Sequence, residues 1–124
     1  MKKVIATVDA PKAVGPYSQA IEVNGTLYIS GQIPVNPADG QIQDEITAAA
    51  HQSLKNIGAI LKEAGMTYDN VVKTTVLLAD IADFKAVNEV YAEYFTGDKP
   101  ARACYQAAAL PLGVKVEIEA IAVR

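Results

Sequence analysis

The chain is poor in the residues that bind metals and form disulfides. Its 124 residues include one cysteine, Cys104, and one histidine, His51. A single cysteine cannot form an internal disulfide, and one cysteine with one histidine falls short of the nitrogen and sulfur ligands of a structural zinc site. We therefore expect a protein of a reducing compartment that holds no structural zinc.

Concentrated positive charge and long apolar runs are also missing. The net charge is -3, the isoelectric point is about 5.0, and the nine lysines are scattered, so no continuous basic surface follows a phosphate backbone. No apolar run approaches the length that crosses a bilayer, and the segment 4–6 is too short for the core of a signal peptide. We expect a soluble cytoplasmic protein that binds neither nucleic acid nor membrane.

The apolar content of the chain fits one globular domain over residues 1–124. It is 51% hydrophobic and 20% charged, which is enough for one sizeable core. Two alternating segments within 20–30 are joined by Asn24-Gly25, a pair that favours a β-hairpin. The following residues, 31–40, are rich in proline, asparagine, aspartate and glycine and predict a surface loop.

Two helices and three further strands are predicted in the rest of the chain. Apolar residues recur at three- and four-residue steps over 44–64, and a second apolar stripe follows Asp80, a good N-cap. β-Branched or alternating segments at 71–79, 101–107 and 114–123 predict strands. The element order favours an α+β fold with two helices on one face of a mixed sheet.

The last predicted strand is apolar on both of its sides. One side carries only apolar residues, and the other carries Glu117 and Glu119 followed by Ile121 and Val123. In so small a protein, this pattern indicates that the helix-free face of the sheet is also buried. A homo-oligomer is the simplest way to bury it.

Arg102 is one of only two arginines and lies in the small, apolar segment 100–104. A guanidinium in such surroundings needs an anionic partner, which is either a ligand or one of the chain's own carboxylates. The alternation of a strand places Cys104 on the same side as Arg102. Because His51 is the only candidate base, we interpret Cys104 as a pocket wall and not as a nucleophile.

Glu117 is the second candidate for chemistry. If Glu117 or Glu119 lies at the edge of an apolar or interfacial region, desolvation would raise its pKa toward the strength of a useful base. The alternative is that both carboxylates are solvated. A simple hairpin of the last two strands would keep Arg102 well away from Glu117. Their convergence therefore requires another strand order or a neighbouring chain.

Three further motifs offer polar groups to a pocket. Asn88 lies within the apolar stripe of the second helix, where its amide must find partners, and a satisfied structural role is favoured over ligand contact. The turn-compatible segments 15–18 and 30–32 could contribute a ring, a hydroxyl and backbone amides. Each of these signals is weak by itself.

Together these motifs closely resemble the reactive-intermediate deaminase (RidA, YjgF-like) family over essentially the whole chain. The segments that carry the resemblance are Gly15-Pro16-Tyr17-Ser18-Gln19-Ala20, Ser30-Gly31-Gln32, Asn88 with Tyr91 and Phe95, Pro100-Ala101-Arg102, and residues 116–122. The resemblance implies a chorismate-mutase-like fold in which three subunits pack their sheets into a barrel. It also implies a cleft at each subunit interface.

The same resemblance implies an activity and a set of residue roles. The deaminating members hydrolyse 2-imino acids such as 2-iminobutanoate and 2-iminopropanoate to 2-keto acids and ammonia, without a cofactor. By motif, Arg102 would hold the substrate carboxylate and Glu117 would position and activate water. The cleft would be lined by Tyr17, Ser30, Gly31, Asn88 and Cys104.

Two other functions remain to be weighed against imine hydrolysis. A non-catalytic small-carboxylate-binding or regulatory protein could use the same arginine pocket. Ribonuclease or translation-inhibitor activity, which some family members have, is disfavoured by the acidic net charge and by the lack of a histidine pair.

Overall fold

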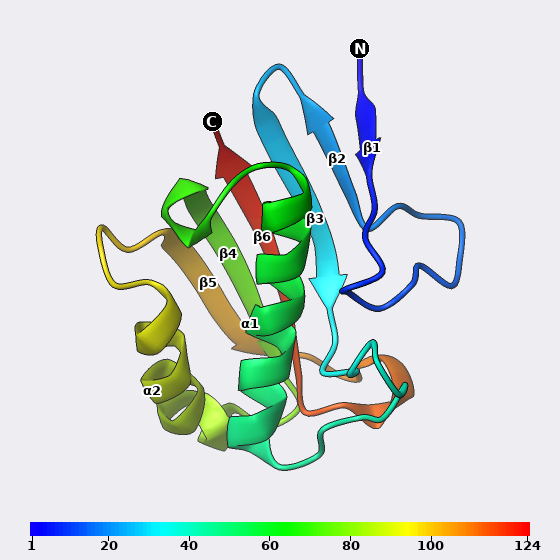
Figure 1. Cartoon of the computed structure of the whole chain (residues 1–124). Coiled ribbons are helices and arrows are strands. Elements are labelled where there is room, and N and C mark those ends of the chain that lie inside the picture. The colour runs from blue at the N-terminus through cyan, green and yellow to red at the C-terminus, as the bar shows by residue number, and fades with distance from the viewer.

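A computed structural model describes all of residues 1–124 as a six-stranded mixed sheet with two helices on one of its faces (Figure 1). Three short 3-10 helices lie between the larger elements, at Tyr68–Asn70, Ile81–Asp83 and Pro111–Gly113. The strands are β1 (Lys3–Ile5), β2 (Ala20–Val23), β3 (Thr26–Gln32), β4 (Val71–Leu78), β5 (Ala101–Gln106) and β6 (Val116–Val123), and the helices are α1 (Ile46–Glu63) and α2 (Phe84–Tyr94).

Local sequence signals account for the ends of most elements. Asn24 and Gly25 both take positive φ, 52° and 79°, as the two-residue turn of the predicted β2–β3 hairpin requires. Gly65, with φ of 74°, follows α1 where a left-handed residue ends a helix. Asp80 caps a 3-10 turn instead of α2 itself, so α2 begins at Phe84.

The strand order is β1-β2-β3-β6-β4-β5, and only the β4–β5 pair is parallel. The α2 helix makes the crossover that a parallel pair needs. The last two strands therefore do not form a hairpin, because β4 lies between them. Burial explains the order: alternate residues of β6 are fully shielded, which suits a central strand, whereas no residue of β5 is fully buried, which suits an edge.

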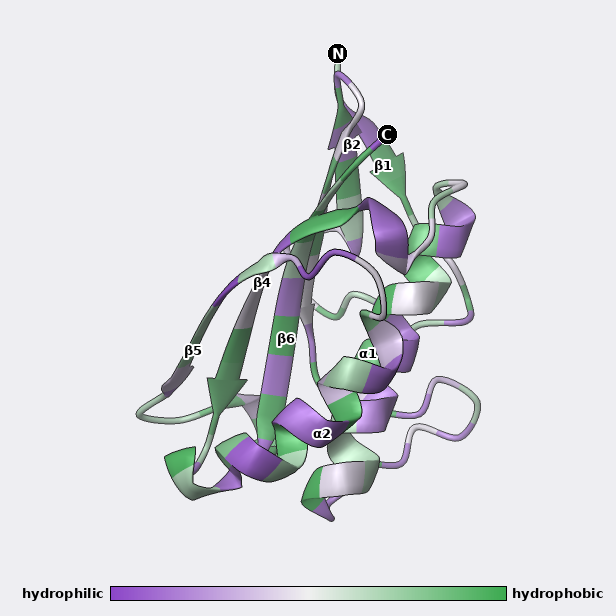
Figure 2. Cartoon of the chain, turned by 90° about the vertical axis from the view of Figure 1, so that its left-hand side faces the viewer, coloured by the Kyte–Doolittle hydropathy of each residue, from purple (hydrophilic) through white to green (hydrophobic).

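The core lies between the sheet and the helices. Leu54, Ile57 and Leu61 of α1 have no solvent exposure and belong to the same apolar cluster as Leu27 and Ile118 of the sheet. Figure 2 shows the helices gathered on one side of the sheet, with hydrophobic and hydrophilic bands alternating along β6. Neither helix combines the length and apolar content needed to span a membrane.

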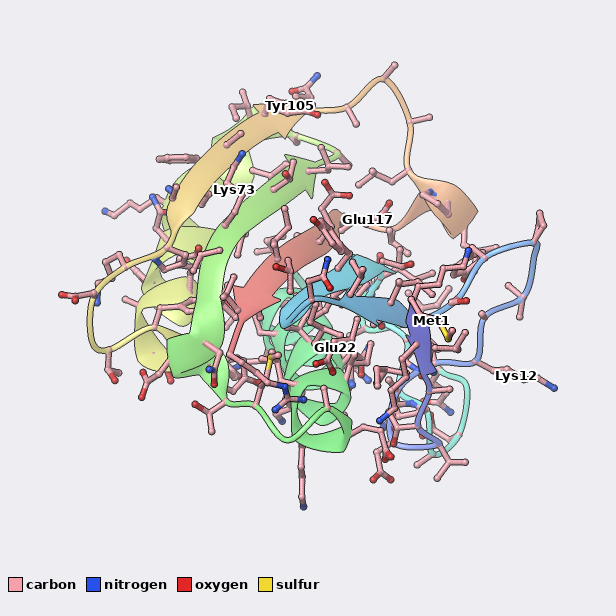
Figure 3. The ribbon with its side chains drawn as sticks, turned by 90° about the horizontal axis from the view of Figure 1, so that it is seen from above. Met1, Lys12, Glu22, Lys73, Tyr105 and Glu117 are labelled. Carbon is pink, nitrogen blue, oxygen red and sulfur yellow. The ribbon has the colours of Figure 1, made fainter.

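The opposite face of the sheet carries no helix and presents several apolar side chains. Tyr28, Tyr105 and Val123 are 50%, 52% and 39% exposed. Tyr28 pairs with Ile121 and Tyr105 with Leu77, and Val123 lies two residues after Ile121 on the same side of β6, so these side chains share one face. Seen from above, Lys73, Tyr105 and Glu117 project from the side of the sheet away from the helices (Figure 3).

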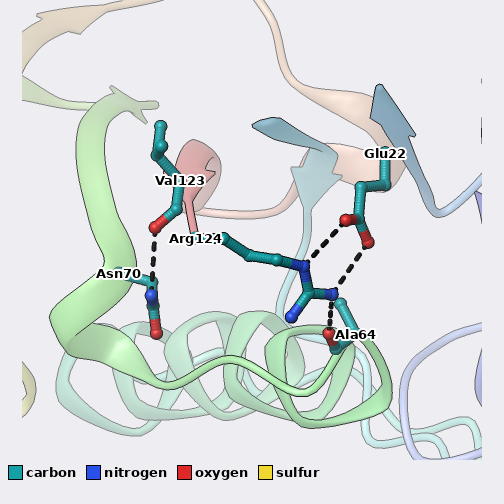
Figure 4. Close-up of polar contacts among 5 residues, drawn as sticks. All are labelled: Glu22, Ala64, Asn70, Val123 and Arg124. Atoms are coloured by element: carbon teal, nitrogen blue, oxygen red, sulfur yellow. Dashed lines mark hydrogen bonds and ion pairs between the residues drawn. The ribbon is translucent and has the colours of Figure 1, made fainter. Parts of the chain in front are cut away.

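A polar clamp holds the C-terminus against β2 and the end of α1 (Figure 4). The Arg124 Nε and Nη2 donate to the two carboxylate oxygens of Glu22 at 2.9 and 3.0 Å, and Nη2 also donates to the Ala64 carbonyl. Asn70 Nδ2 adds a hydrogen bond to the Val123 carbonyl at 3.0 Å. The second arginine of the chain therefore has its anionic partner within the fold.

Candidate active site

Arg102, on β5, has no carboxylate partner within the chain. Its Nη1 donates to Asn88 Oδ1 of α2 at 2.7 Å, and this is its only side-chain hydrogen bond. The guanidinium carbon lies 4.9 Å from the centre of the Tyr91 ring and 5.4 Å from that of Phe84. Of the two predicted partners, a ligand or a carboxylate of the same chain, the internal carboxylate is not found. The guanidinium contacts an amide oxygen and two ring faces instead.

Asn88 and Cys104 accompany Arg102 on the helix-covered side of the sheet. Asn88 finds the hydrogen-bond partner that its place in the apolar stripe requires, and that partner is Arg102 itself. Cys104 packs against the core, where burial raises the pKa of its thiol and the charge of Arg102 lowers it to a smaller extent. His51 contacts Tyr94 Oη at 2.8 Å, so no Cys-His pair activates this thiol.

A second group of predicted residues surrounds Glu117 on the helix-free face. A cavity of about 590 Å³ brings together Tyr17, Ser30, Gly31 and Glu117. Its remaining wall is largely apolar, with Glu119 at one side, and is formed by Val14, Ile33, Pro111, Leu112 and Glu119. A carboxylate beside an apolar wall can bind a small molecule and act on it.

A β-bulge in β3 makes room for the Glu117 carboxylate. Ile29 pairs with Ala120 and Gln32 with Ile118, so Ser30 and Gly31 together oppose a single residue of β6. A Cβ atom at Gly31 would lie 1.9 Å from Oε2 of Glu117. Glycine is therefore required at this position for the carboxylate to keep its place.

Glu117 has the electrostatic surroundings of a base. It is half-buried, whereas Glu119, on the same face, is exposed. Burial is the main cause that raises the pKa of Glu117 above its ordinary value, and the negative charge of Glu119 raises it further. A carboxylate with a raised pKa accepts a proton more readily than an ordinary one.

The loop that carries Tyr17 is held in place by hydrogen bonds from Ser30 and Gln19. Ser30 Oγ donates to the Ser18 carbonyl at 2.6 Å, and Ser30 N donates to the Gln19 carbonyl at 2.9 Å. The Gln19 side chain donates in turn to the carbonyls of Ala10 and Pro11. Tyr17 itself is 51% exposed and can contact a molecule in the cavity.

The seven predicted site residues thus form two groups that do not share a cavity within one chain. Leu77 pairs with Glu117 on one side and with Tyr105 on the other, and paired residues share a face of the sheet. Glu117 therefore lies on the helix-free face with Tyr105. Arg102 pairs with Thr74, whose hydroxyl reaches Tyr91 of α2, so Arg102 lies on the helix-covered face. The first group is Tyr17, Ser30, Gly31 and Glu117, and the second is Asn88, Arg102 and Cys104.

Sequence reasoning missed the side chains that surround Arg102 and the apolar wall of the cavity. Phe84 and Tyr91 lie four residues before and three after Asn88, so they share its side of α2. That spacing was visible in the sequence, but only pairing β5 with β4 brings Arg102 to the same place. No group of three or more histidine, cysteine, aspartate or glutamate side chains is arranged to hold a metal ion.

Comparison with known proteins places this arrangement in a family. Residues 7–124 match the family model described as Endoribonuclease L-PSP. A mouse protein named 2-iminobutanoate/2-iminopropanoate deaminase is 58% identical over 125 residues, covering 100% of this chain and 93% of its own. The chain belongs to the reactive-intermediate deaminase (RidA, YjgF-like) family.

Solved structures of RidA relatives match the fold closely. A Yersinia pestis protein of the Rid family superimposes with a TM-score of 0.97 at 50% identity, covering 100% of both chains. Escherichia coli TdcF, solved with bound serine, has a TM-score of 0.95 at 44% identity and covers 98% of both chains. The mixed sheet with two helices is therefore the RidA fold, as the resemblance implied.

Proposed function

We propose that this RidA protein hydrolyses 2-imino acids, such as 2-iminobutanoate and 2-iminopropanoate, to 2-keto acids and ammonia. The observation that carries the proposal is Arg102, a fixed cation with no carboxylate partner in its own chain. A guanidinium offers two parallel donors to a carboxylate, which every 2-imino acid has. The mouse relative's name, and serine in the TdcF structure, support a small α-carboxylate compound as the ligand.

Glu117 supplies the base in this mechanism. Its carboxylate takes a proton from a water molecule as the water oxygen bonds to C2 of the imine, the C=N electron pair moves to nitrogen, and Glu117 returns the proton to that nitrogen. In the resulting carbinolamine, Glu117 takes the hydroxyl proton and passes it to the amino group, which leaves as ammonia as the C–N bond breaks and the oxygen electron pair forms the C=O bond of the ketone. A positioned base contributes about 10²–10⁴-fold, which suits an imine that already hydrolyses in water.

We further propose that the complete site forms between subunits of a homotrimer whose sheets pack into a barrel. Arg102 and Glu117 lie on opposite faces of one sheet, which supports a site in which Arg102 of one chain and Glu117 of the partner subunit line the same cleft. The exposed apolar side chains of the helix-free face, including Tyr28 and Tyr105, support burial against another copy. Tyr17, Ser30 and Gly31 join Glu117 in lining the cleft, and Asn88 and Cys104 join Arg102.

The other two functions have less support. A non-catalytic carboxylate-binding protein would need Arg102 but would have no use for a half-buried base such as Glu117. Ribonuclease action, which the family model's description names, finds no histidine pair here, since His51 contacts Tyr94 on the helix layer. A net charge of -3 also disfavours an RNA substrate.

The test is to generate 2-iminobutanoate in situ with a threonine dehydratase and to follow the release of 2-ketobutanoate. Wild type should accelerate the release, and both Arg102→Ala and Glu117→Gln should lose the acceleration. Arg124→Ala is the matched control, because it removes the other arginine and should keep the activity. No acceleration by wild type would overturn the proposal, and binding of 2-ketobutanoate without turnover would favour the carboxylate-binding protein.

A mixing experiment tests the site between subunits. Arg102→Ala and Glu117→Gln chains, each inactive alone, are co-expressed so that mixed oligomers form. Sites that combine Glu117 of one variant with Arg102 of the other are intact, so the mixture should regain part of the wild-type activity. A site confined to one chain predicts no recovery, and light scattering should give the mass of three chains for wild type.

A further inference from the structure

Arg102 is seated against two aromatic rings that the mechanism above does not use. The guanidinium carbon lies 4.9 Å from the centre of the Tyr91 ring and 5.4 Å from that of Phe84. Both distances fall within the range in which a cation is attracted to the face of a ring. The two rings and Asn88 come from one side of α2, so one helix contacts the guanidinium at three points.

The Tyr91 ring is itself held in place by the strand next to Arg102. Its hydroxyl lies 2.7 Å from Thr74 Oγ1, and Thr74 has no solvent exposure. Thr74 is also the residue of β4 that pairs with Arg102 of β5. Phe95, with its ring centre 4.5 Å away, also packs on the Tyr91 ring. The ring is thus fixed by contacts that do not involve the guanidinium.

We infer that Tyr91, held by Thr74, and Phe84 are positioning residues that orient the Arg102 guanidinium for a substrate carboxylate. This inference rests on the proposed role of Arg102. Arginine has a long, flexible side chain, and a bidentate pair forms only when both donors lie in one plane facing the carboxylate. Ring faces restrict the orientation of the guanidinium plane but leave its charge in place. An internal carboxylate would neutralise that charge. The charge therefore remains available to a ligand.

The structure offers a matched pair of substitutions to test the role of Tyr91. Tyr91→Leu removes the ring that faces Arg102, whereas Tyr94→Leu removes a tyrosine ring from the same helix that contacts His51 and Tyr68 instead. The dissociation constant of 2-ketobutanoate, a stable carboxylate with the substrate's skeleton, should rise about three- to thirtyfold in Tyr91→Leu. Phe84→Leu should raise it to a smaller extent, and Tyr94→Leu should leave it unchanged.

A double-mutant cycle separates positioning from a general loss of structure. In an Arg102→Lys background the ammonium has no planar fork to orient. Adding Tyr91→Leu should therefore weaken 2-ketobutanoate binding by much less than it does in wild type. With 2-iminobutanoate as substrate, Tyr91→Leu should raise KM more than it lowers kcat. Tyr91→Phe, which keeps the ring and removes the bond to Thr74, should give an intermediate effect.

The outcomes distinguish this inference from the proposed function. Equal weakening by Tyr91→Leu in the arginine and lysine backgrounds would overturn the positioning role, as would wild-type binding in Tyr91→Leu. Binding of 2-ketobutanoate by wild type without any imine turnover would overturn the proposed function. It would leave the positioning role to be decided by the cycle, which needs only binding.

Discussion

The two arginines of this chain lie in opposite kinds of surroundings. Arg124 donates to both carboxylate oxygens of Glu22 and to a backbone carbonyl, in an exposed clamp at the end of the sheet. Arg102 is half-buried and donates to one amide oxygen, with aromatic rings in place of a carboxylate. Glu117, the other charge of the candidate site, likewise has no cationic partner.

The difference shows how to separate structural charges from functional ones. An ion pair completed within the fold satisfies both of its members, so neither has further capacity to bind a ligand group of opposite charge. A half-buried charge held by neutral groups keeps that capacity, at a cost in desolvation that the fold must offset elsewhere. The sequence alone did not show which of the two arginines had an internal partner.

Removing the Arg102 side chain should give the largest effect on activity. Arg102→Ala should lower kcat/KM for 2-iminobutanoate about a hundredfold or more, because it removes two charge-assisted hydrogen bonds to the substrate. Its free energy of unfolding should fall only modestly, by about 1 to 2 kcal/mol, because it loses the hydrogen bond to Asn88 and the two ring contacts of a half-buried side chain but no ion pair. Denaturant unfolding and the coupled dehydratase assay measure the two quantities. Strong destabilisation with matching loss of activity would contradict the comparison.

The Glu117 half of the site can be disturbed without touching any charge. In Gly31→Ala the new methyl group displaces the flexible end of Glu117, so kcat should fall about ten- to a hundredfold while the chain still folds. Gly97→Ala is the control, because the nearest atom to its added Cβ is 3.7 Å away, an ordinary contact. A Gly31→Ala protein with wild-type kcat would mean that the position of Glu117 does not matter.

The pH dependence of activity should report on Glu117. The reaction needs the Glu117 carboxylate ionised, so kcat/KM should fall on acidification. Because burial and the charge of Glu119 raise the pKa of Glu117, this fall should occur at a higher pH than an ordinary glutamate side chain would give. Glu119→Gln removes one of these causes and should move the acid limb of the profile to lower pH. An acid limb that stays in place in Glu119→Gln, measured from pH 4 to 8, would assign it to another group.

The Arg124 clamp should show the smallest effect, and on stability only. Arg124→Ala should slightly lower the melting temperature at pH 7, because exposed ion pairs contribute little. The hydrogen bond from Arg124 lowers the pKa of Glu22 from 4.5, so the clamp stabilises above that pH and loses its effect as Glu22 is protonated in the folded protein. The difference between wild type and variant should therefore shrink on acidification to what the bond from Arg124 to the Ala64 carbonyl contributes. A difference that grew at low pH would contradict this account.

Several features of the fold were predictable because they depend on a few neighbouring residues. Asn24-Gly25 sets the β2–β3 turn through its backbone conformation, and the period of α1 sets the side that it buries. The hairpin and both helices were confirmed with small differences at their ends, such as the 3-10 turn before α2. The placement of Cys104 on the same side of β5 as Arg102, and of Glu117 and Glu119 together on one side of β6, was also confirmed by the pairing with β4.

The sequence by itself thus determined the elements, the buried side of each and the candidate residues. Only the tertiary structure decided that β4 separates β5 from β6, that Asn88 and two rings hold Arg102, and that Gly31 lies beside Glu117. Turns and periodicity follow from local sterics, which a short segment contains in full. Strand order depends on which arrangement best buries all the apolar faces together, and that choice is made by the whole chain.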